Sequence, residues 1–176
     1  MSRQPSFVEV VAKTIVVHTV TYFLAGLGAL FFFDYASQFA DPDFPLPMRQ
    51  LDDPVVMAGP LFQPLRGLLF GAVFYTLRSV IFRPKDGWLI LWMILLFIGI
   101  FSTFGPAPAS IEGLVYLTIP WQEQLNGITE ILVQSLALAG LLYVWVSGPR
   151  RRWLDWLLGI AFFVILSLAL LGIFYG

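Results

Sequence analysis

The chain contains five long apolar stretches with few charges, and this pattern constrains its fold more than any other feature. Each stretch has roughly 17–23 residues, enough for an α-helix to cross a hydrocarbon core of about 30 Å. A spanning segment must be helical or part of a closed barrel, because the bilayer offers no water to backbone N–H and C=O groups. Barrel strands alternate apolar and polar residues, whereas Leu89–Phe101 is apolar throughout. The stretches are Thr14–Phe33, Leu61–Phe82, Trp88–Phe104, Leu125–Val146 and Trp153–Tyr175.

We therefore predict an all-α integral membrane protein: a five-helix transmembrane bundle that forms a single domain over residues 1–176. Only 12% of the residues are charged, whereas about a quarter are charged in soluble domains. The first stretch lacks a convincing small-residue cleavage site, so we interpret it as a retained helix rather than a signal peptide. The chain has no cysteine, which excludes disulfides, thiolate metal sites and iron–sulfur clusters.

Two segments flank the first apolar stretch. We expect Met1–Val11 to lie partly along the interface as an amphipathic lead-in, and the Pro-rich stretch Asp34–Gly59 to be an extended surface segment. Pro60 and Pro64 suit the first turn of the second helix, where a missing N–H is harmless.

Residues 109–124 form an unusual connection, too apolar for a solvated loop and too short to span. We expect Ser110 to cap a short helix with Glu112 in its first turn, and Pro120 to end that helix. The pattern predicts an interfacial or re-entrant outer segment that rests on the ends of the bundle.

Positive charges sort to one side of a five-span topology. That side has eight of the ten Lys and Arg residues, and the other side has only Arg49 and Arg66. Because Lys and Arg are enriched in short cytoplasmic loops, the bias predicts a cytoplasmic (inner) membrane protein with the N-terminus inside and the C-terminus outside. The eight are Arg3, Lys13, Arg78, Arg83, Lys85, Arg150, Arg151 and Arg152.

This topology can be tested by cysteine labelling, since the chain has no native cysteine. We expect a membrane-impermeant reagent to label cysteines at Gln50 and Glu123 from outside, and to leave cysteines at Lys85 and Arg151 protected. The reverse pattern at either pair would contradict the five-span assignment.

Arg66 is the first candidate binding residue, because a charge within a membrane helix is costly unless it is paired or reaches the interface. With Gln63 and Glu112 it predicts an outward-facing site for an anion or a lipid headgroup. The alternative is an Arg66–Glu112 ion pair that holds the outer segment against the bundle, or an Arg that simply reaches the interface.

His18, the only histidine, lies in the first stretch on a polar stripe with Thr14 and Thr21. It is a candidate for proton handling or for axial ligation of a single tetrapyrrole. The competing interpretation is a hydrogen bond to another helix. No other cofactor and no metal site is predicted.

Gly67 and Gly71 form a GxxxG pair, which lets helix backbones approach closely and marks a packing face. Glu130 and Gln134 share a face of the fourth stretch, and we interpret them as interhelical hydrogen-bonding groups. Neither pair indicates catalysis.

The favoured function is a non-enzymatic accessory or structural subunit that docks through its helix faces to other membrane subunits. The expected partners are the lipid bilayer and such subunits, and no nucleic acid. One alternative is a small transporter, or a solute- or headgroup-binding protein, using Arg66 and Glu112. The other is a membrane-embedded enzyme acting on lipid. Catalysis is disfavoured because we expect His18, Gln134 and Arg66 at different depths, too far apart to converge.

Overall fold

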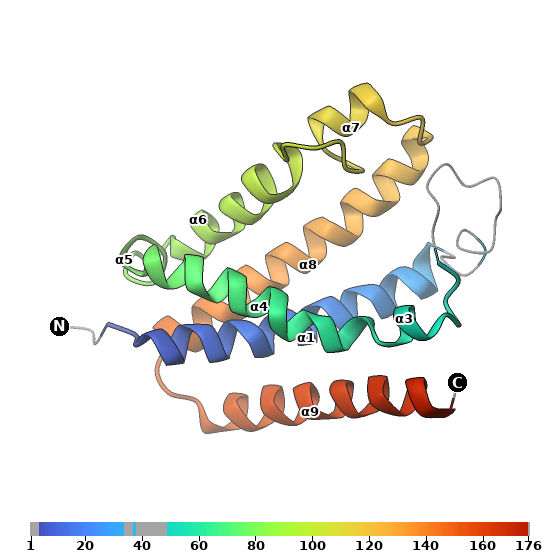
Figure 1. The fold of residues 1–176 in the computed structure, drawn as a ribbon. Helices are drawn as coiled ribbons and strands as arrows, with labels where there is room; N and C mark the ends of the chain where they lie inside the picture. Colours follow the sequence, from blue (N-terminus) through green and yellow to red (C-terminus); the bar gives the residue numbers. More distant parts are fainter. Residues whose placement is uncertain (1–3, 34–36, 38–48, 176) are drawn as a thin grey trace.

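The computed structural model describes residues 4–33, 37 and 49–175, and every regular element among them is helical (Figure 1). The structure is 79% helical, so the predicted all-α fold class is confirmed. In chain order the elements are α1 (Phe7–Phe32), α3 (Pro54–Met57), α4 (Gly59–Thr76), α5 (Arg78–Ile81), α6 (Gly87–Met93), the π-helix η1 (Ile94–Phe101), α7 (Ile111–Tyr116), α8 (Trp121–Ser147) and α9 (Arg152–Tyr175).

Three helices, α1, α8 and α9, are long and apolar enough to span a membrane. They cover the first, fourth and fifth predicted stretches, and they agree with a protein that is integrated into a bilayer. The other two stretches do not meet the same criteria as continuous helices. The second is divided at Leu77 into α4 and the four-residue α5. The third forms α6 and η1 and ends at Phe101 rather than at Phe104.

α1 begins earlier than its apolar stretch does. The Ser6 side chain accepts a hydrogen bond from the Glu9 N–H at 3.2 Å, so the helix begins at Phe7 rather than near Thr14. The part of the expected lead-in from Phe7 to Val11 therefore belongs to the helix itself. The hydroxyls of Thr14 and Thr21 donate to backbone carbonyls one turn earlier, at 2.7 and 2.8 Å, so these buried polar groups are satisfied within α1.

The outer segment differs in part from its prediction. Ser110 caps α7 as expected, because its side chain accepts a hydrogen bond from the Gly113 N–H at 2.9 Å. However, α7 ends at Tyr116, and Pro120 comes directly before α8. Residues 121–124 therefore form the first turn of a long helix, since a proline that cannot continue one helix is compatible with the start of the next.

The connection before α4 lies mostly outside the described residues, but its last part is not extended. Asp53 caps α3 by accepting a hydrogen bond from the Val55 N–H at 2.8 Å, and it also pairs with Arg49 at 2.9 Å. These two contacts hold the pKa of Asp53 below its usual range. Pro60 stands in the first turn of α4 as predicted, whereas Pro64 lies inside the helix.

α4 packs very closely against α1. A Cβ atom at Gly67 would lie 2.6 Å from the Cα of Ile15, and one at Gly71 would lie 2.8 Å from the Cα of Val11. Glycine is therefore required at both positions for this approach. The GxxxG face is a contact within the chain. Gln63 and Phe74 are buried on the same face of α4.

Hydrogen bonds hold α1, α8 and α9 together at one end of the molecule. Lys13 pairs with Glu9 at 2.9 Å and donates to the Trp145 carbonyl at 2.7 Å. The Trp145 indole in turn donates to Asp155 of α9 at 2.6 Å. From this end the axes of α1 and α8 diverge (Figure 1). The divergence leaves space between the two helices further along the bundle.

The α6–η1 segment packs on α8. The Trp92 indole donates to Ser135 at 3.1 Å, and the Tyr143 hydroxyl donates to the Pro84 carbonyl at 2.8 Å. The buried core includes Leu91 and Leu142 beside Phe74 of α4. Residues from α1, α4, η1 and α8 consequently face one another in the middle of the bundle.

We expect Gly67→Ala to lower the free energy of unfolding in detergent by roughly 1–3 kcal/mol, the usual cost of overpacking. The reason is that the added methyl group meets backbone atoms of α1, which cannot move aside without separating the helices. Gly140→Ala in α8 is the matched control, because a Cβ there has no neighbour within 4 Å. Equal stabilities of the two variants would contradict the α1–α4 packing.

Candidate functional site

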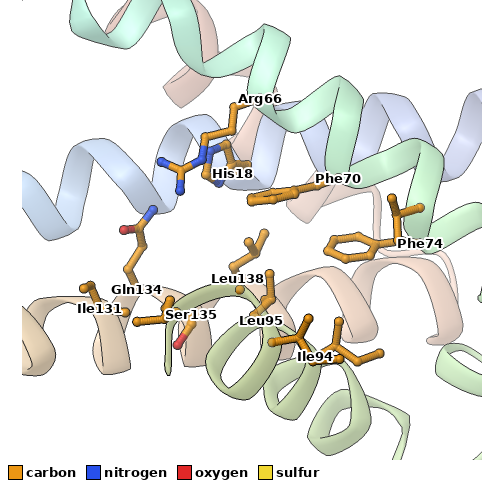
Figure 2. Close-up of a pocket in the computed structure, with 14 residues that line it drawn as sticks. His18, Arg66, Phe70, Phe74, Ile94, Leu95, Ile131, Gln134, Ser135 and Leu138 are labelled. Atoms are coloured by element: carbon orange, nitrogen blue, oxygen red, sulfur yellow. The ribbon is translucent and has the colours of Figure 1, made fainter. Parts of the chain in front are cut away.

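A cavity of about 530 Å³ lies between α1 and α4 on one side and η1 and α8 on the other (Figure 2). Its walls are mainly apolar, and a few polar side chains reach into it, which is the usual composition of small-molecule sites. The lining residues are His18, Arg66, Phe70, Val73, Phe74, Ile94, Leu95, Ile98, Gly99, Ile100, Ile131, Gln134, Ser135 and Leu138.

His18 is fixed at one edge of the cavity by α4. Its ring is 1% exposed, and its Nε2 lies 3.2 Å from the Oε1 of Gln63. The Gln63 amide nitrogen donates to the Gly59 carbonyl at 3.2 Å, which orients the amide so that Oε1 faces the ring. Oε1 can only accept, so the hydrogen bond requires a proton on Nε2. The ring also packs edge-on against Phe70, with centroids 5.1 Å apart.

Arg66 brings a positive charge into this cavity. Its guanidinium lies over the Phe70 ring at 5.5 Å and points into the space between α4 and α8 (Figure 2). Arg66 is not a member of the ion pairs Lys13–Glu9, Arg49–Asp53 and Arg150–Asp155. Arg66 is an exposed residue, so its guanidinium is reached from the surface of the bundle as well as from the cavity.

The opposite wall comes from α8. The Gln134 amide extends toward Arg66 and His18 across the cavity (Figure 2). Ser135 is already used in structural contacts, since its hydroxyl accepts from the Trp92 indole at 3.1 Å and donates to the Leu132 carbonyl at 3.2 Å. Gln134 therefore adds both an amide donor and an acceptor to the site, whereas Ser135 has little freedom to act on a ligand.

His18, Arg66 and Gln134 line one cavity, whereas the sequence predicted that they lie at three different depths. The reason lies in the helix limits. α1 begins at Phe7, so His18 lies well inside the helix rather than one turn from its end. α4 begins at Gly59 and follows α3, so Arg66 is in its second turn or beyond and not at the edge.

Glu112 lies apart from this group. It is in the short helix α7, near the N-terminal end of α8 (Figure 1), and it does not line the cavity. Gln63 and Arg66 thus share a site with His18 rather than with Glu112. Sequence reasoning did not anticipate Phe70 and Phe74 as cavity walls. Their spacing of four residues on α4, one turn beyond Arg66, was the signal available.

Comparison with known protein families, with curated proteins and with solved structures finds no match. Within the part of the chain that the structure describes, no three His, Asp or Glu side chains are grouped to hold a metal ion. Ligation of a tetrapyrrole by His18 stays a prediction. Its Nε2 is engaged by Gln63, so a ligand bound at that nitrogen must first displace the amide.

We expect Gln63→Met to destabilise the protein by about 1–3 kcal/mol, the cost of leaving a buried donor unsatisfied at His18. The double variant His18→Phe with Gln63→Met removes both partners and should recover part of that loss. The measurement is the free energy of unfolding in detergent, with Gln122→Met as an exposed control on α8. Strict additivity of the two single changes would show that His18 and Gln63 do not interact.

Proposed function

We propose that this membrane protein binds an anionic amphiphile inside the bundle, with the charged head at Arg66 and apolar parts against the cavity walls. The observation that carries the proposal is the Arg66 guanidinium, which points into a largely apolar cavity of about 530 Å³ (Figure 2). In the membrane topology proposed below, a bound anion offsets the cost of this charge directly, because electrostatic attraction is strong where water is scarce.

The surroundings of Arg66 suit the rest of such a ligand. Gln134 and Arg66 offer hydrogen-bond donors to an oxyanion from opposite walls. Phe70, Phe74 and Leu95 offer apolar surface to the adjoining hydrocarbon. The cavity volume lies within the range of about 300–1,000 Å³ that is usual for ligand sites.

The binding interpretation takes precedence over an accessory subunit for one reason. The Gly67–Gly71 face, the best docking face in the sequence, is occupied by α1 of the same chain. The remaining apolar surfaces, such as the exposed Trp156 and Phe163 of α9, are ordinary for helices in contact with lipid. A lipid-acting enzyme has the least support, because Ser135 is held in structural hydrogen bonds.

The proposed topology is five spans in the cytoplasmic membrane, with the N-terminus inside and the C-terminus outside. Its support is the eight-to-two distribution of Lys and Arg residues in the sequence. In this arrangement α4 with α5, and α6 with η1, form the second and third spans. The Arg66 site then lies within the membrane and faces ligands that are dissolved in lipid.

We expect Arg66→Gln to weaken binding of an anionic amphiphile by roughly tenfold to a hundredfold, since a hydrogen bond to a charged group contributes about 1.5–3 kcal/mol. Binding of an uncharged analogue should change little. The measurement compares decyl phosphate with decanol on the protein in nanodiscs.

Arg78→Gln is the matched control, because Arg78 also lies over an aromatic ring, that of Tyr75 at 4.2 Å, but does not line the cavity. The proposal fails if Arg66→Gln and Arg78→Gln have the same effect on decyl phosphate.

A further inference from the structure

A second cavity of about 640 Å³ lies between the diverging parts of α1 and α8. Its walls are almost entirely apolar and come from the C-terminal half of α1 and the middle of α8. The lining residues are Thr21, Leu24, Ala25, Gly28, Ala29, Phe32, Phe33, Thr129, Glu130, Val133, Gln134, Ala137 and Leu141.

The two cavities adjoin at Gln134, which lines both. On α1 they lie along one face of the helix. His18 lines the first cavity, and Thr21, Ala25, Gly28 and Phe32 follow it in steps of three or four residues along the second. A linear molecule with one end at Arg66 therefore meets the second cavity on passing Gln134.

We propose that the second cavity holds the hydrocarbon chain of the amphiphile whose anionic head binds at Arg66. This inference rests on the proposed function, and it defines the ligand class as a long single chain with a phosphate or carboxylate head. The chain passes Gln134 and lies between α1 and α8.

The size and polarity of the second cavity favour a hydrocarbon chain over water. An apolar cavity of about 150 Å³ lined by Leu, Ile and Phe stays dry and accepts benzene. The second cavity has roughly four times that volume, so a considerably longer chain has room.

Two glycines of α1 provide a matched pair of variants. A Cβ atom at Gly26 or at Gly28 meets nothing within 4 Å, so neither position is closed to a side chain by the neighbouring backbone. Gly28 lines the second cavity and Gly26 does not. Gly28→Leu therefore fills chain space, whereas Gly26→Leu is a control of the same size in the same helix.

The experiment uses dodecyl phosphate with a photoreactive diazirine at the chain end, and the full-length protein in phosphatidylcholine nanodiscs. Mass spectrometry locates the residues that are labelled in a saturable manner. We expect saturable labelling of second-cavity residues such as Leu24 and Val133, its retention in Gly26→Leu, and its loss in Gly28→Leu. Competition by unlabelled dodecyl phosphate or by dodecanoate distinguishes a phosphate head from a carboxylate head, and failure of both to compete overturns the proposal.

The remaining outcomes separate the two proposals. Saturable labelling that requires Arg66 but falls outside the second cavity, or that survives Gly28→Leu, overturns the chain assignment and leaves the head site intact. Saturable labelling of the second cavity that is unchanged by Arg66→Gln overturns the proposed function, and with it the placement of the head.

Discussion

The close packing of α4 on α1 is the contact on which the rest of this structure depends. Gly67 and Gly71 leave no side chain between the two backbones, so α4 lies at a distance that larger residues would not permit. One turn before them on the same face, Gln63 then reaches His18. Arg66, three residues after Gln63, lines the cavity beside His18 (Figure 2).

Helix α8 completes the site because it is attached to α1 at one end and separates from α1 at the other. Hydrogen bonds through Lys13, Trp145 and Asp155 hold α8 and α9 against the start of α1. Beyond these hydrogen bonds α8 diverges from α1. Residues of both helices line each of the two cavities there. A membrane bundle without a water-driven hydrophobic effect between its helices depends on such packing and polar contacts, so the positions of these few residues define its shape.

The sequence predicted most of the helices, because long apolar stretches report directly on burial in lipid, and it predicted the Ser110 cap from local hydrogen-bonding chemistry. The sequence could not predict how far along the bundle each polar side chain lies. The limits of α1 depend on Ser6, a polar residue outside the apolar stretch, and Pro64 lies inside α4 although proline usually marks a helix start. The association of Arg66 with Glu112 rested on an outer segment whose position is a tertiary property. Gln134 and Phe70 became site residues only through the packing of three helices.

The close packing of α4 against α1 joins Gln63 to His18, and this contact can be measured directly. Because the chain has a single histidine, ¹⁵N-histidine labelling reports on one imidazole, with separate signals for Nδ1 and Nε2, in solid-state NMR of the protein in bilayers. With ¹³C-glutamine added, we expect a proton on Nε2 and none on Nδ1, together with a dipolar coupling from Nε2 to the side-chain carbonyl carbon of Gln63. An imidazole that lacks this coupling and exchanges its proton with water would contradict it.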